Sequence, residues 1–204
     1  SSRDWVIRIL PQWAEPSNRV DGRPTRSASL RGRRRRRRHP WRGAARDAGP
    51  ARDVAPLPEA TAAVLQRHSR SILFRKTWGD AIHVVFQTAS AAAKAALEMN
   101  LATARLAEEL EFGRRLEFRT AVHFGTADHN FDPIEEAPTF YGPQLSLAAR
   151  IVPVAPPGGV FVTEPCAAQL SLEGDSGVEC SYVGTTSLAK GYGRVRLLTL
   201  SSRG

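Results

Sequence analysis

The hydrophobic and polar positions follow two periodicities along residues 57–200, and together they predict an ordered domain of mixed α and β structure. Short apolar or alternating runs predict strands at residues 71–75, 81–86, 116–124, 160–163, 178–183 and 195–200. Apolar positions at helical spacing predict helices at residues 60–66, 88–110, 144–152 and 163–170. This order of elements predicts an α+β sandwich in which helices cover one sheet.

The first 55 residues lack both periodicities. Residues 19–52 are rich in Arg, Gly, Pro, Ser and Ala and hold almost no large aliphatic side chains, a composition that predicts disorder. Residues 5–10 have the pattern of a short strand, but the prolines at 11, 16 and 24 leave it without a partner nearby. We therefore divide the chain into an Arg-rich arm, residues 1–55, and a domain, residues 56–204.

The charge changes at the same boundary. Residues 1–55 carry 15 Arg against 5 acidic residues, whereas residues 56–204 carry 14 basic and 15 acidic residues. An arm of this kind attaches to phosphate backbones without sequence preference, so nucleic-acid binding is one hypothesis for its function. The Arg-rich stretch has no aromatic residue beyond Trp41, which gives base stacking little support.

Cysteine content and hydropathy indicate the compartment. Cys166 and Cys180 occur without a CxxC or Cys/His ligand spacing, which argues against a disulfide-dense secreted scaffold and a structural zinc site. No apolar run approaches the roughly 20 residues that cross a bilayer, and the N-terminus has no signal pattern. The sequence thus favours a soluble protein of the reducing cytoplasm.

Four short stretches hold chemistry that periodicity does not explain. They are Lys76-Thr77-Trp78-Gly79-Asp80, Arg119-Thr120-Ala121-Val122-His123-Phe124-Gly125, Tyr141-Gly142-Pro143 with Ala148-Ala149-Arg150-Ile151, and Leu188-Ala189-Lys190-Gly191. In this order they resemble the class III adenylate/guanylate cyclase catalytic domain, and Pro156-Pro157-Gly158 resembles a segment of its bacterial branch. The resemblance covers residues 71–200 and implies a ferredoxin-like α/β sandwich.

The resemblance also implies a reaction and its metal ions. In that family the ribose 3′-hydroxyl of ATP or GTP attacks the α-phosphorus, pyrophosphate leaves, and two Mg²⁺ or Mn²⁺ ions neutralise phosphate charge. Asp80 matches one of the two carboxylates that hold the ions. An aspartate that merely follows Gly in a turn is the alternative interpretation.

Four further residues match positions that contact the nucleotide. Lys76 and Thr139 match the pair that reads the purine edge, and the hydroxyl at 139 leaves ATP and GTP both open. Arg150 matches the arginine that steadies the transition-state phosphate. Ser146 stands where the family usually carries an Asn that orients the ribose. A solvated strand lysine and a helix-surface arginine remain the alternatives for Lys76 and Arg150.

Two motif positions differ from the family or have no expected contact with substrate. At the Lys190-Gly191 turn, Tyr192 replaces a second, phosphate-binding lysine of some members, and Arg194 is the candidate to substitute for it. His123 matches a strand position of the family and is expected to pack or hydrogen-bond there, not to bind a metal.

A polar segment follows that strand. Residues 128–139, which contain Pro133 and Pro138, are expected to form a polar loop. Asp128, His129 and Asp132 are accordingly not expected to bind a metal.

We do not find the opening strand of the family's domain. That strand carries the other metal carboxylate, in a Phe-x-Asp-Ile/Val-x-Gly-Phe pattern, and counting back from Asp80 by the family's spacing reaches the run at residues 33–38. Neither Asp4 nor Asp53 is followed by the Gly-Phe turn. We therefore expect the arm to be disordered or foreign to the domain, the sheet to lack a central strand, and the site to lack one metal anchor.

Three functions stay open on the sequence. The first is a cyclase whose composite sites form between two protomers, with Asp80 on one side of a site and Lys76 on the other. The second is an inactive cyclase-like module that dimerises or binds nucleotide, which the missing carboxylate and Ser146 favour. The third is nucleic-acid binding through the arm.

Overall fold

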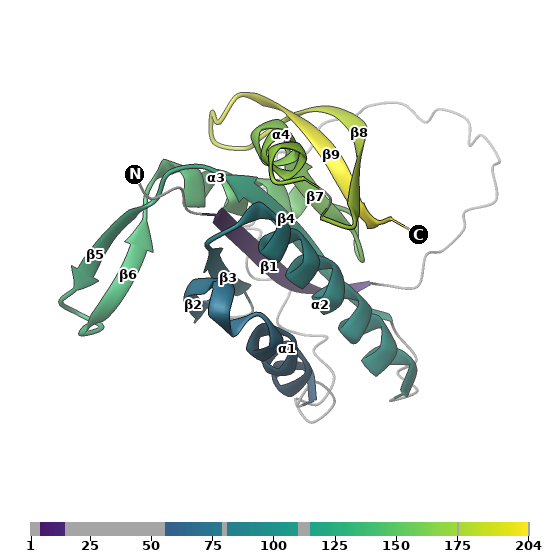
Figure 1. Cartoon of the computed structure of the whole chain (residues 1–204), viewed down its shortest axis with the longest axis horizontal. Helices are drawn as coiled ribbons and strands as arrows, with labels where there is room; N and C mark the ends of the chain where they lie inside the picture. Colours follow the sequence, from purple (N-terminus) through teal and green to yellow (C-terminus); the bar gives the residue numbers. More distant parts are fainter. Residues whose placement is uncertain (1–4, 15–55, 79–80, 110–114, 175, 204) are drawn as a thin grey trace, which may run out of the picture.

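The computed structural model describes residues 5–14, 56–78, 81–109, 115–174 and 176–203 (Figure 1). A seven-stranded sheet has the order β2-β3-β1-β4-β7-β9-β8, and β5 pairs with β6 in a separate sheet. The strands are β1 Trp5–Ala14, β2 Ile72–Trp78, β3 Ala81–Phe86, β4 Arg115–Phe124, β5 Asp128–Asp132, β6 Ala137–Tyr141, β7 Val160–Thr163, β8 Val178–Ser187 and β9 Arg194–Ser202. The helices are α1 Pro56–Arg67, α2 Ala89–Glu109, α3 Pro143–Ile151 and α4 Glu164–Leu172, with short 3₁₀ turns η2 Ser69–Ser71 and η3 Val152–Val154.

Helices lie on both faces of the large sheet. On one face α1, α2 and α4 form a layer (Figure 1), and their buried side chains share a hydrophobic cluster with strand residues such as Val122. On the other face Ala121, the neighbour of Val122 in β4, packs with Ile151 of α3. Successive side chains of a strand point to opposite faces, so β4 contributes to both hydrophobic clusters. None of the helices in the described ranges is long and apolar enough to cross a bilayer.

Strand β1 corrects a prediction made from the sequence. Its residues Trp5 to Ile9 pair antiparallel with β3, and Trp5 to Ala14 pair antiparallel with β4. The sheet therefore has its central strand, and the expectation that the chain lacks it is wrong. With β1 in place, β1-α1-β2-β3-α2-β4 and the order β2-β3-β1-β4 form the ferredoxin-like unit that the resemblance implies.

The prediction failed because both partners of β1 are distant in the sequence. Pro11 is tolerated because β1 pairs with β3 only as far as Ile9, so Pro11 faces a ladder on the β4 side alone, opposite Phe118. The rest of the arm, residues 15–55, lies outside the described residues, and so do Asp4 and Asp53.

The β5–β6 hairpin corrects a second prediction, since the segment at 128–139 is not a loop. Asp128 pairs with Tyr141 and Asp132 with Ala137, and only the turn at 133–136 separates the strands. Oδ1 of Asp132 accepts hydrogen bonds from the backbone N–H groups two and three residues later, at 2.8 and 3.2 Å. Figure 1 shows this hairpin standing apart from the seven-stranded sheet on the side of β2. Its exposed faces explain the polar composition.

The first turn of α2 is held by two side chains. Oγ1 of Thr88 accepts a hydrogen bond from the Ala91 N–H at 3.2 Å, so Thr88 caps the helix. The carboxylate of Glu173, at the end of α4, accepts from the Ala89 and Ser90 N–H groups at 2.9 and 2.8 Å. Partial burial acts to raise the pKa of Glu173, but these hydrogen bonds outweigh it and hold the pKa below its usual value.

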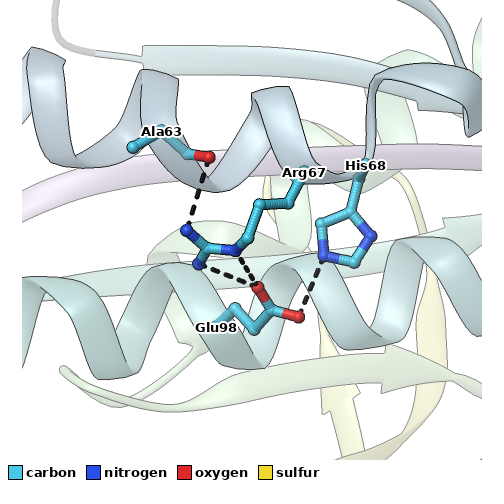
Figure 2. Close-up of polar contacts among 4 residues, drawn as sticks. All are labelled: Ala63, Arg67, His68 and Glu98. Atoms are coloured by element: carbon cyan, nitrogen blue, oxygen red, sulfur yellow. Dashed lines mark hydrogen bonds and ion pairs between the residues drawn. The ribbon is translucent and has the colours of Figure 1, made fainter.

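Glu98 fastens α1 to α2 (Figure 2). Its carboxylate accepts hydrogen bonds from Nε and Nη2 of Arg67 at 3.2 and 3.0 Å and from Nε2 of His68 at 3.0 Å. Nη1 of Arg67 also donates to the Ala63 carbonyl at 3.4 Å. Partial burial acts to raise the pKa of Glu98, and the hydrogen bonds from Arg67 and His68 more than offset it, so that the pKa is lowered.

Candidate functional site

Lys76 lies on β2, an edge strand, and contacts the β5–β6 hairpin. Its ammonium group forms an ion pair with Glu135 in the hairpin turn. Phe74, two residues earlier, contacts Phe140 of β6 with 5.5 Å between ring centroids. Alternate residues of a strand share a face, so Phe74 and Lys76 present one face of β2 to the hairpin.

Thr139 lies next to Phe140 in β6 and is half-buried. Its register partner in β5 is Asn130. Because neighbours in a strand point to opposite sides, Thr139 lies on the face of β6 away from the one that meets Phe74. The structure thus brings Lys76 and Thr139 onto adjacent elements with their side chains on different faces.

The chain passes directly from β6 into α3, which carries Ser146 and Arg150. Gly142 joins the two elements with φ 131°, a conformation that is strained for any residue with a Cβ. Pro143 then occupies the first turn of the helix. Ser146 and Arg150 are four residues apart and therefore share one face of α3.

Arg150 keeps its hydrogen-bond donors largely unused. Its Nε is buried and has no hydrogen-bond partner among the described residues. The guanidinium carbon lies 5.5 Å from the ring centroid of Tyr192, within the range of a cation–π contact. A buried donor that lacks a partner is costly, so this group is ready to bind an acceptor such as a phosphate oxygen.

His123 anchors the start of α3 to the sheet. The ring is buried in β4, with Nε2 2.7 Å from Oε1 of Gln144 and Nδ1 2.9 Å from Oγ1 of Thr163. Burial lowers the pKa of His123, and the bond to Gln144 only partly opposes this. The neutral ring therefore donates to Gln144 and accepts from the Thr163 hydroxyl, which confirms a hydrogen-bonding role. A Cβ at Gly125 would lie 2.5 Å from Cγ of Gln144, so the close approach needs glycine.

The Thr163 hydroxyl does not cap α4. The helix begins after Thr163 with proline in its first turn, within one residue of the predicted start, and the Thr163 hydroxyl makes no cap hydrogen bond there. It is directed to His123 instead.

Asp80, the predicted metal ligand, lies outside the described residues. It directly precedes Ala81, whose pairing with Trp78 closes the described part of the β2–β3 hairpin. In the parts of the chain that are described, no group of three or more His, Cys, Asp or Glu side chains is placed to hold a metal ion. The described residues therefore do not form a metal site by themselves, and the role of Asp80 stays a prediction.

A cavity of about 850 Å³ lies elsewhere, between α4 and the β8–β9 pair. Glu164 and Arg196, which line it, form an ion pair at 2.8 Å. None of the predicted site residues lines this cavity. The cavity therefore gives no support to the predicted site residues, and their own contacts are the remaining evidence on them.

Sequence reasoning missed three residues that shape the site. Glu135 was not singled out, because a glutamate in a turn has no distinguishing pattern. Gln144 was read only as part of a helix, although its place beside Pro143 put it at the helix start. Tyr192 was noted only as a replacement, and its contact with Arg150 depends on two elements distant in the sequence.

Solved structures share the fold. Adenylate cyclases from Trypanosoma brucei in their monomeric state match with TM-score 0.66 and 20% identity, over 96% of this chain and 89% of that chain. The adenylyl cyclase CyaB from P. aeruginosa matches with TM-score 0.63 and 14% identity, over 98% and 95%. The guanylyl cyclase Cya2 matches with TM-score 0.65 and 17% identity, over 99% and 94%.

Sequence comparison gives one short match and one broad match. A putative serine/threonine-protein kinase/receptor, R826, of Acanthamoeba polyphaga mimivirus is 32% identical over 65 residues, which span 32% of this chain and only 4% of the viral protein. The family model of the adenylate and guanylate cyclase catalytic domain matches residues 64–202, more than half of the chain. The chain therefore belongs to the adenylate and guanylate cyclase catalytic domain family.

Proposed function

We propose that this domain converts ATP or GTP into a 3′,5′-cyclic nucleotide and pyrophosphate, and that it works as a homodimer. The observation that carries the proposal is the state of Arg150, whose buried Nε has no partner among the described residues and whose helix follows directly from β6. Few structural roles leave a buried guanidinium donor unused, whereas a phosphoryl-transfer site requires such a donor.

The proposed reaction assigns a task to each of four side chains. The ribose O3′ forms a bond to the α-phosphorus, its proton is released, and the bond from that phosphorus to pyrophosphate breaks. Arg150 would neutralise charge that develops on the phosphate oxygens, and Ser146, one helical turn earlier, would bind the ribose. Lys76 and Thr139 would bind the base edge, which requires the β5–β6 hairpin to turn so that the Thr139 side chain faces the same space as Lys76.

The ion pair between Lys76 and Glu135 does not prevent base binding. Both side chains are partly exposed, at 34% and 50%, and exposed ion pairs are worth about 1 kcal/mol or less. A purine that offers a good acceptor can therefore compete with Glu135 for the ammonium group.

The metal ions and the second protomer belong to the same proposal. Mg²⁺ or Mn²⁺ held by Asp80 would supply positive charge to the phosphates. Asp80 would come from one protomer and Lys76 from the other. Large apolar side chains exposed near the hairpins support such an interface, with Trp78 71%, Phe131 58% and Ile134 91% exposed.

The cellular compartment and the bacterial origin of the protein are inferred from its cysteines and from one short sequence segment. Two free cysteines, one of them buried, support a reducing cytoplasm, where ATP and GTP are abundant. The Pro156-Pro157-Gly158 segment supports a bacterial origin. Nucleic-acid binding by the arm rests on composition alone, because residues 15–55 lie outside the described residues.

A non-catalytic module that binds nucleotide or dimerises is the second candidate. It is favoured by Ser146, whose hydroxyl reaches less far than an Asn amide, and by the single carboxylate that the sequence assigns to the metals. Losing one well-placed donor can lower a rate by about 10² to 10³.

One assay separates these candidates. The purified chain is incubated with ATP or GTP and Mn²⁺, and cyclic AMP and cyclic GMP are measured alongside Asp80→Ala and a variant with residues 15–55 replaced by a short Gly/Ser linker. We expect product from the chain and from the linker variant, which keeps β1, and none from Asp80→Ala. Nucleotide binding without product from a folded protein would identify the inactive module instead. Salt-sensitive DNA retention that is lost only with the linker would assign nucleic-acid binding to the arm.

A further inference from the structure

We propose that Tyr192 is a positioning residue for Arg150, and that its ring fixes the guanidinium while leaving the N–H groups free for a phosphate. The proposal rests on the proposed function in one respect, which is that Arg150 binds the phosphate of a nucleotide. The observation behind it is the 5.5 Å separation between the guanidinium carbon of Arg150 and the ring centroid of Tyr192.

An aromatic ring orients an arginine without using its donors. The guanidinium donates hydrogen bonds in its own plane, whereas the attraction to a ring acts through the faces of the two groups. A carboxylate partner would occupy those donors and neutralise the charge. Among the described side chains, no carboxylate forms an ion pair with Arg150 and its buried Nε has no acceptor. Tyr192 thus supplies a contact that leaves the hydrogen-bond donors of Arg150 available.

The turn that carries Tyr192 has a defined shape. Lys190, Gly191 and Gly193 have φ values of 61°, 75° and 75°, all in the left-handed region. The Leu188 N–H donates to the Gly193 carbonyl at 2.9 Å and closes the turn. Lys190 is a non-glycine residue in this region, a conformation that persists only where the surroundings impose it. The turn therefore holds Tyr192 in place by its own backbone.

The same hydrophobic cluster fixes the turn and the helix. Leu188 is buried and packs in one cluster with Ile151, the residue that follows Arg150 in α3. Residues in a close-packed cluster cannot shift independently of one another. The positions of Tyr192 and Arg150 relative to each other are thus set by the core beneath them, which is what a positioning contact requires.

The test uses two substitutions of Tyr192 and one control. Tyr192→Phe keeps the ring, and Tyr192→Leu keeps apolar volume without a π face. Tyr182→Leu is the matched control, because Tyr182, in β8, is also an exposed tyrosine, and its hydroxyl bonds the nearby Thr185 hydroxyl. Thermal unfolding of each variant confirms that the protein is folded before any comparison is made.

The first readout is pyrophosphate binding by calorimetry, which needs no turnover. We expect Tyr192→Leu to weaken the affinity roughly three- to tenfold, as expected for loss of a partly desolvated cation–π contact, and Tyr192→Phe and Tyr182→Leu to leave it unchanged. In an Arg150→Ala background, Tyr192→Leu should add no further loss, because the ring acts through the arginine.

The second readout is the split between kcat and KM in the Mn²⁺ assay. We expect Tyr192→Leu to lower kcat by a similar factor with little change in KM, because Arg150 acts mainly on the transition state. If Tyr192→Leu binds pyrophosphate as the unaltered chain does, if Tyr192→Phe is as impaired as Tyr192→Leu, or if the losses add in the Arg150→Ala background, the inference is overturned. It is also overturned if the unaltered chain does not bind pyrophosphate.

Failure of the proposed function gives a different result. A chain that forms no cyclic nucleotide but shows the expected pyrophosphate pattern would retain the pairing of Tyr192 with Arg150 and lose the assignment as an active cyclase.

Discussion

The two faces of the large sheet use polar groups in opposite ways. On the face covered by α1, α2 and α4, Glu98 and Glu173 are each held by several donors, and Asn100 bonds both the Gly158 carbonyl and the Thr120 hydroxyl. On the α3 face, Arg119 and Arg150 each keep a buried Nε without a partner among the described residues. Nη1 of Arg119 does donate to the Ala155 carbonyl. Within the described part of the chain, the buried side chains without a partner thus lie away from the face covered by α1, α2 and α4.

We therefore expect the residues that stabilise the fold and the residues that bind substrate to lie on different faces of the sheet. Substitutions on the face covered by α1, α2 and α4 should change the free energy of unfolding, whereas substitutions at Arg150 should change binding and turnover. His123 is an exception on the α3 face, because both of its ring nitrogens form hydrogen bonds within the protein. We therefore expect its substitution to change the free energy of unfolding.

The largest change in the free energy of unfolding is expected in β1, because this strand supports the packing on both faces of the sheet. Ile7→Pro removes a backbone N–H and distorts a strand that pairs with β3 and β4 at that residue, which should cost about 3 kcal/mol or more. Gln12→Pro is the control, since position 12 pairs only with β4, and it should cost less. Urea unfolding of the two variants decides this, and equal stability of Ile7→Pro and the unaltered chain would contradict the placement of β1.

Arg150→Ala should lower the rate strongly while changing the stability little. We expect kcat to fall by about 10² to 10³, because an oriented donor to the transition state is lost. The free energy of unfolding should change by about 1 kcal/mol or less, since the side chain gives up little beyond its contact with Tyr192. Arg105→Ala, at an exposed arginine of α2, should leave the rate unchanged. A large loss of stability in Arg150→Ala would place this arginine among the structural groups.

His123→Leu should destabilise the fold by roughly 1–3 kcal/mol, because Gln144 and Thr163 each lose a buried partner. The pKa of His123 is lowered in the folded chain, so the unfolded chain takes up a proton first as the pH falls below about 6.5. Stability from this residue is therefore present above pH 6.5 and is lost as the pH falls through the lower folded pKa. Urea unfolding between pH 5 and 8 should show this fall in the free energy of unfolding with falling pH in the unaltered chain and in the control His129→Leu. The fall should be absent in His123→Leu.

Glu173→Gln should have the smallest effect, about 1 kcal/mol, as expected for a weakened helix cap. The folded pKa of Glu173 is lowered, so its contribution is present above the usual value of 4.5 and is lost as the pH falls through the folded pKa. Glu179→Gln, at an exposed residue of β8, serves as the control. Thermal unfolding at pH 7 and at pH 3 should show a larger difference in stability between the two variants at pH 7 than at pH 3.

Local pattern predicted the elements better than their partners. The helix at 88–110 and the strands around Trp78 follow from periodicity and turn chemistry, and the structure confirms them within a few residues. The sequence did not predict the β5–β6 hairpin, because a small exposed sheet has no buried apolar face and therefore no alternating pattern of apolar residues. The motif around Arg150 and Ser146 predicted their helix and shared face, while the unused Nε and the Tyr192 contact had no signature in the sequence.

By itself the sequence determined which residues form helices and strands, which residues match the family, and where the charge is concentrated. Only the tertiary structure decided that residues 5–14 complete the sheet, that His123 holds the start of α3, and that Arg150 lies over Tyr192. Local propensity and periodicity act over a few neighbouring residues, whereas strand pairing and side-chain contacts join positions that folding alone brings together.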